Sequence, residues 1–118
     1  MPFDQAIQHV TDALAAKGFG VLTTIDVQVT MKKKLNVEFR PYTILGACNP
    51  EFAYKALQSE EMIGTMLPCN VVVEEISKGS VEVSAVDPVA SMSAIKNPKL
   101  ATIAREVRDL LKQVVSGL

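Results

Sequence analysis

Apolar positions near the start of the chain recur with the period of an α-helix. These positions are Phe3, Ile7, Val10 and Leu14, at spacings of four, three and four. The spacing aligns them along one stripe of a helix over residues 3–17, which Gly18 can end. After the glycine, residues 19–25 are a short run of large and β-branched apolar residues, which is the pattern of a buried strand.

The next segment, residues 26–35, fits two patterns. Its apolar residues alternate as in a strand, but some of them also lie four apart as in a helix. Asp26 is a good N-cap, and the basic run 32–34 suits the negative C-terminal end of a helix dipole. We therefore predict a helix over residues 26–35 that ends at Asn36, followed by a second strand over residues 40–48.

Three Asn-Pro or Asp-Pro pairs each predict the start of a helix, because a capping side chain precedes a proline in the first turn. The pairs are Asn49-Pro50, Asp87-Pro88 and Asn97-Pro98. They begin predicted helices over residues 50–58, 88–95 and 98–117. The last of these carries its apolar residues on one broad face, namely Leu100, Ile103, Val107, Leu110, Leu111 and Val114.

Residues 69–76 and 81–86 form the clearest pair of strands. Gly79 lies in the short segment between them and supports a tight hairpin turn, so the pair should be antiparallel. Residues 62–67 are apolar but interrupted by Gly64, and we expect a buried connector or a single turn there.

These elements predict an α+β fold, with a small mixed or antiparallel sheet of about four strands and helices packed on one face. The 118 residues suit one domain, residues 1–118. The sheet face or edge that the helices leave free needs cover, and a second copy of the chain can supply it. We therefore expect a homodimer.

Composition narrows the classes of partner. The 12 basic and 13 acidic residues nearly cancel and are scattered, and aromatic residues make up 5%, so nucleic acid is not an expected partner. Apolar runs are shorter than the roughly 18 residues that cross a bilayer, and the start lacks a charged leader followed by an apolar core. We expect a cytoplasmic protein without a membrane partner, whose two cysteines are free thiols.

Four segments of the chain match, in order, the signatures of one protein family. They read GFGVL with IDV at 18–27, PYTILGACNP at 41–50, LPCNVVV at 67–73 and DP at 87–88. In these segments, and over essentially its whole length, the chain resembles the DUF302 family of uncharacterised bacterial and archaeal proteins. The resemblance implies a TT1751-like α+β fold that tends to form homodimers, and it implies no established activity. Family members commonly begin with a strand before the first helix, whereas here the predicted helix comes first. Either the start of the chain or the completeness of the sheet differs from the family pattern, and a sheet that lacks this strand would leave an edge exposed.

The cysteines are the candidates for chemistry. Cys48 precedes the Asn49-Pro50 helix start, where free N–H groups and the helix dipole favour a thiolate. It could be a nucleophile, a redox sensor or a metal ligand, or a small apolar residue that fills a strand end. Cys69 opens the following strand, and only an antiparallel or non-adjacent placement of the two strands brings the thiols together. We predict no zinc site, since His9 is the only histidine and we expect it in solvent.

Weaker candidates for ligand binding are polar. Glu38, Arg40 and Tyr42 alternate along or before the second predicted strand, so they could line one face and bind a small polar ligand. A solvated face with a charge pair is the alternative. Asn49 and Asn70 complete the candidates, although helix capping already accounts for Asn49.

Three classes of function remain open, and no motif names a cofactor or a reaction. The chain could be a homodimeric module that binds a small ligand or a partner. It could instead be a thiol-based redox or metal-responsive protein or enzyme that uses Cys48, with or without Cys69. The third class is a purely structural protein. We favour the binding module, because nothing in the sequence supplies the general base that thiol catalysis needs.

Overall fold

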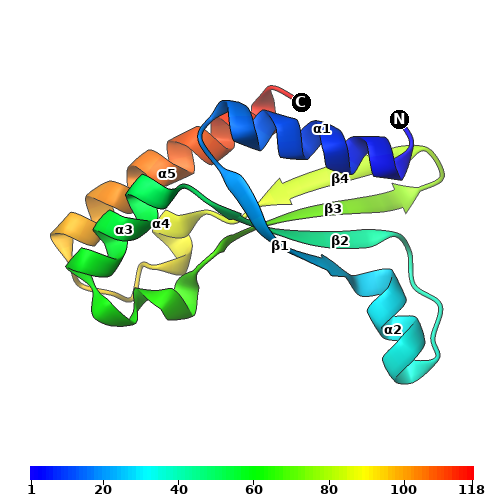
Figure 1. Ribbon diagram of the computed structural model, residues 1–118, viewed down its shortest axis with the longest axis horizontal. Coiled ribbons are helices and arrows are strands. Elements are labelled where there is room, and N and C mark those ends of the chain that lie inside the picture. The colour runs from blue at the N-terminus through cyan, green and yellow to red at the C-terminus, as the bar shows by residue number, and fades with distance from the viewer.

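The computed structural model describes residues 1–118 and has a four-stranded antiparallel sheet flanked by helices (Figure 1). In chain order the elements are α1 (Phe3–Ala16), β1 (Gly20–Asp26), α2 (Val27–Leu35), β2 (Tyr42–Cys48), α3 (Pro50–Ser59), the 3₁₀ helix η1 (Glu61–Met66), β3 (Cys69–Ser77), β4 (Ser80–Ala85), α4 (Pro88–Ser91) and α5 (Pro98–Ser116). The predicted α+β class and the number of strands are confirmed.

The strands lie in the order β1-β2-β3-β4, so each strand pairs with its neighbour in sequence. All three pairs are antiparallel. Helix α2 connects β1 to β2, and α3 with η1 connects β2 to β3. The β3–β4 hairpin turns at Gly79, whose φ of 80° is a left-handed conformation that glycine adopts without strain.

The core lies between one face of the sheet and two helices. Figure 1 shows α1 and α5 on the same side of the sheet, and their apolar stripes meet the inward side chains of β2 and β3. This core includes Val10 and Leu14 of α1, Leu45 of β2, Val71 and Val73 of β3, and Val107 and Leu111 of α5. Burying each such side chain contributes about 1.5–3 kcal/mol to stability.

The opposite face of the sheet is much less covered. Ile44 and Val72 on this face are half-buried and Ile25 is exposed, whereas Leu45 next to Ile44 is fully buried. The molecule measures 43 × 32 × 20 Å, and its radius of gyration of 15.2 Å exceeds the about 13.5 Å of a compact chain of this length. It is therefore a thin, open structure of two layers.

Side-chain caps explain where the helices begin. Asp26 Oδ1 accepts the Val29 N–H at 3.0 Å, and Asn36 ends α2 in the left-handed conformation with a φ of 54°. These two ends confirm the predicted helix over residues 26–35, whose sequence also fits the alternation of a strand. Asp87 and Asn97 likewise accept N–H groups in the first turns of α4 and α5.

Several predicted segments differ from the structure. The expectation of a buried strand over residues 19–25 was wrong, because β1 lies at the edge of the sheet and only Val21 in it is half-buried. β2 begins at Tyr42, two residues later than expected, because residues 36–41 are an irregular connection. Helix α4 ends at Ser91 instead of residue 95. Turns closed by hydrogen bonds such as Ile95 N–H to Met92 O follow it, and Pro98 disfavours a helical conformation at the residue before it.

The apolar connector before β3 is the 3₁₀ helix η1, and only part of it is buried. Ile63 is fully buried, but Met62 and Met66 are 68% and 43% exposed. A short 3₁₀ helix contacts the body of a protein along one side only, so the expectation of a buried connector was wrong for the two methionines.

Helix α5, the longest at 19 residues, buries one face and exposes charged residues on the other. No helix in the structure combines the length and the apolar character needed to span a bilayer.

Candidate functional site

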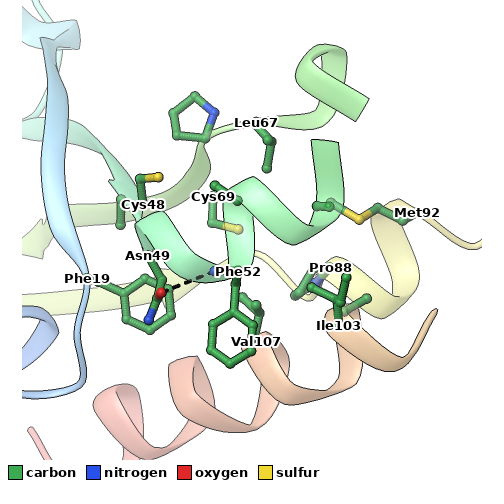
Figure 2. Close-up of a pocket in the computed structure, with 15 residues that line it drawn as sticks. Phe19, Cys48, Asn49, Phe52, Leu67, Cys69, Pro88, Met92, Ile103 and Val107 are labelled. Atoms are coloured by element: carbon green, nitrogen blue, oxygen red, sulfur yellow. Dashed lines mark hydrogen bonds between the residues drawn. The ribbon is translucent and has the colours of Figure 1, made fainter. Parts of the chain in front are cut away.

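A small apolar cavity lies at the end of the sheet where β2 ends and β3 begins (Figure 2). Its volume is about 40 Å³, which is room for about three water molecules. Of its 15 lining residues, 12 are hydrophobic. They are Phe19, Ala47, Cys48, Asn49, Phe52, Ala53, Ala56, Leu67, Pro68, Cys69, Pro88, Met92, Ile103, Ala104 and Val107.

The register of the sheet brings the two cysteines to this cavity. Ala47 of β2 pairs with Cys69 of β3, so the C-terminal end of β2 lies beside the N-terminal end of β3. The antiparallel placement is thus the one that unites Cys48 and Cys69, and both are free thiols. Figure 2 shows their sulfur atoms on the cavity side of the strand ends.

The two thiols have different environments. Cys69 is only 7% exposed, and burial, together with the charge of nearby Cys48, raises the pKa of its thiol. Desolvation disfavours the charged form of a buried thiol, so Cys69 is neutral at pH 7. Cys48 is half-buried and belongs to the more accessible part of the lining. The cavity therefore has one accessible and one protected sulfur.

Helix α3 begins at the wall of the cavity. Asn49 Oδ1 accepts the Phe52 N–H at 3.4 Å, drawn as the dashed line in Figure 2, and Pro50 occupies the first helical turn. The capping role expected for Asn49 is confirmed. Its amide also lies against Gly18, because a Cβ added to this glycine would be 3.0 Å from Asn49 Nδ2.

Sequence reasoning missed Gly46, which lies two residues before Cys48 in β2. A Cβ at this position would collide with Thr23 Oγ1 and lie 2.7 Å from Pro68 Cγ. The absence of a side chain lets β1 and the segment before β3 approach β2 closely. A glycine inside an apolar strand was the available signal for such an approach.

Glu38, Arg40 and Tyr42 lie at the other end of β2 or before it, away from the cavity. Arg40 Nε pairs with Glu74 Oε2 at 2.8 Å, and its guanidinium also lies over the Tyr42 ring at 5.6 Å from the centroid. Glu38 pairs with Lys32 at 2.7 Å instead. The structure thus brings Arg40 and Tyr42 together, whereas Glu38 pairs with Lys32 of α2.

The remaining polar candidates lie outside the cavity. Asn70 is exposed on the open face of the sheet, paired with Gly46. His9 is exposed on α1, as expected. No group of three or more His, Cys, Asp or Glu side chains lies close enough together to hold a metal ion.

Comparison with known proteins gives a family. The family model described as a domain of unknown function, DUF302, matches residues 1–118. The chain belongs to the DUF302 family. The crystal structure of an uncharacterized conserved DUF302 protein from Bacillus stearothermophilus has a TM-score of 0.89 and 26% identity, and the match covers 98% of this chain and 90% of that one. No curated protein matches the chain.

The segments that carry the DUF302 resemblance converge on the cavity. Each of the four segments supplies at least one lining residue, for example Phe19, Cys48, Cys69 and Pro88. These residues are far apart in sequence, and the fold places all of them around one space. The cavity is therefore the best candidate for a site in this DUF302 protein.

Proposed function

We propose that this DUF302 protein is a homodimeric, single-domain binding module whose cavity between Cys48, Cys69 and α3 takes a small apolar ligand. The convergence of all four family segments on one apolar cavity supports this function most directly. Binding sites are commonly concave and mostly apolar, with a few polar groups that orient the ligand. Here the thiols and the Asn49 amide are the polar groups.

The size of the cavity limits the ligand. Sites for drug-sized molecules measure about 300–1,000 Å³, far more than the about 40 Å³ found here. A ligand of a few heavy atoms fits as the cavity stands. A larger one requires movement of the wall that carries Met92, which follows the four-residue helix α4.

Xenon under pressure is a suitable probe, because dry apolar cavities bind it. We expect saturable NMR shifts at methyl groups of the lining, such as those of Leu67 and Val107. Ala53→Leu should fill the cavity and abolish the shifts. Ala15→Leu on the exposed side of α1 adds the same atoms elsewhere and should leave them unchanged. Equal shifts in Ala53→Leu and the wild type would contradict binding at this site.

The surface area supports the homodimer. A compact monomer of 12.8 kDa exposes about 6,300 Å². This chain exposes 7295 Å², about 1,000 Å² more. A standard interface buries about 800 Å² on each partner, so the excess matches what one interface needs.

The open face of the sheet is where we place the second copy. Ile25, Ile44 and Val72 pair with one another across β1, β2 and β3 and form an apolar row in the middle of this face. Helix α2, which connects β1 to β2, buries no residue of its own and exposes Val29 and Leu35. A second copy on the open face would cover the row and could also cover α2.

Sedimentation velocity tests the homodimer. We expect twice the chain mass of 12.8 kDa at micromolar concentration, and a monomer for Ile44→Glu, which puts a charge on the apolar row. Gln113→Glu adds the same charge to the exposed side of α5 and should remain dimeric. A wild-type protein that remains monomeric at high micromolar concentration would contradict the proposed homodimer.

We also infer a cytoplasmic location. Both cysteines are free, and reducing compartments keep thiols in that state.

A further inference from the structure

The backbone positions of Cys48 and Cys69 suit a disulfide. Cys48 is one residue beyond Ala47, the partner of Cys69 in the β2–β3 ladder. Standard strand dimensions put the Cα atoms of such a diagonal pair about 6 Å apart. Cα separations in disulfides are usually about 4.4–6.8 Å, so the bridge needs little movement of the backbone.

The direction of the side chains is the second requirement. In a regular ladder, successive residues point to opposite faces, which would separate these two sulfurs. Cys48 is the last residue of β2, however, and α3 begins two residues later, after the Asn49 cap. Both cysteines nevertheless line the same cavity, with their sulfur atoms on its side (Figure 2). The influence of the Cys48 charge on the pKa of Cys69 also reflects their proximity.

Unequal burial gives the two thiols an order of reaction. Cys48 is half-buried at the start of α3, whereas Cys69 is 7% exposed. A small oxidant therefore reaches Cys48 first. We propose that Cys48 and Cys69 form a redox pair, in which a hydroperoxide oxidises Cys48 and Cys69 then closes an intramolecular disulfide.

The chemistry balances in two steps. The Cys48 thiolate attacks one oxygen of the hydroperoxide, the O–O bond breaks, and the leaving alkoxide takes up the thiol proton, which gives Cys48 sulfenic acid and an alcohol. Cys69 then loses its proton, attacks the Cys48 sulfur and displaces hydroxide, which leaves as water with that proton. Two thiols and one hydroperoxide thus yield one disulfide, one alcohol and one water.

The bond would tie together the ends of the segment that contains α3 and η1, since both elements lie between the two cysteines. Disulfide formation needs no ligand in the cavity and no partner chain. The redox pair and the binding function are therefore tested independently, because xenon binding is measured on the fully reduced protein.

Hydrogen peroxide is the probe for this reaction. We treat the reduced protein with one equivalent, with and without dimedone, and measure intact mass and linked peptides. The wild type should lose two hydrogen atoms in mass through a Cys48–Cys69 crosslink within one chain. Cys69→Ser should form no crosslink and should instead accumulate a dimedone adduct on Cys48. Cys48→Ser should react with neither reagent.

Folding of the variants has its own control. If Cys69→Ser unfolds the chain, Cys69→Ala is used in its place. The wild type also gives an independent test, because in a time course with dimedone the adduct on Cys48 should form before the crosslink. A crosslink found only between chains would overturn the redox pair. So would dimedone adducts on both cysteines without a crosslink, or thiols that stay unreactive until the protein is denatured.

Discussion

Gly46 is a point at which β1, β2 and the segment before β3 come into contact. We predict that Gly46→Ala is destabilising, because the new methyl group would collide with Thr23 Oγ1 and Pro68 Cγ. Overpacking of this kind costs about 1–3 kcal/mol in the free energy of unfolding, which urea denaturation measures. Gly64→Ala is the matched control, since a Cβ there meets nothing within 4 Å. Similar losses in both variants would show that the close approach at Gly46 is not responsible.

The Cys69 thiol should make stability depend on pH. Burial raises the pKa of this thiol, so the folded protein keeps a proton that the unfolded chain loses above about pH 8.5. The protonated Cys69 thiol therefore contributes fully to stability below that pH. The free energy of unfolding falls as the pH rises toward the pKa of the thiol in the folded protein. We predict a steeper fall for the reduced wild type than for Cys69→Ala, measured by urea denaturation between pH 7 and about 10. Parallel curves would contradict this environment for Cys69.

Helix α2 depends on its cap more than the other helices do. It has nine residues and none is buried, and helices this short are marginal without packing. We predict that Asp26→Ala lowers the local stability of α2 by about 1 kcal/mol, because the Val29 N–H loses its acceptor. Faster amide hydrogen exchange in α2 would report the loss.

Asp26→Asn separates the cap from the charge. Asparagine keeps an acceptor for the Val29 N–H, so its exchange rates should stay close to those of the wild type. If Asn and Ala accelerate exchange equally, the carboxylate acts through its charge and not as a hydrogen-bond acceptor.

Most elements were predictable because their signals are local. A capping side chain next to a proline marks the first turn within a few residues, and Asn49, Asp87 and Asn97 all cap the helices they were expected to begin. The end of α4 was not predictable in the same way. Its residues continue in turns that pack against α5, and contacts of this kind lie outside any local window.

Only part of the candidate site could be predicted from the sequence. Cys48 was recognisable from the helix start that follows it, but its meeting with Cys69 depends on the Ala47–Cys69 register, which sequence left open. Phe52 of α3 and Met92, which follows α4, also line the cavity. Their place in the lining depends on how these elements pack against α5, which the sequence does not show. A cavity is formed by side chains distant in sequence, so periodicity and capping cannot locate it.

The thin two-layer shape affects the whole molecule's response to heat. If a second copy covers the open face, folding and association are linked, and the melting temperature rises with protein concentration. We predict this rise for the wild type and its absence for Ile44→Glu, measured by calorimetry over a hundredfold range of concentration. A wild-type melting temperature independent of concentration would argue against the dimer.

Helix α5 supplies Val107, Leu111 and Val114 to the same core as Val10 and Leu14 of α1. The first and last helices therefore share one interior, and neither can bury its apolar stripe without the other. A chain that stops before α5, or is cut by a protease at residues 92–97 and loses α5, keeps every strand but lacks one side of its core. Such fragments should expose the apolar stripe of α1 to solvent and should not fold stably.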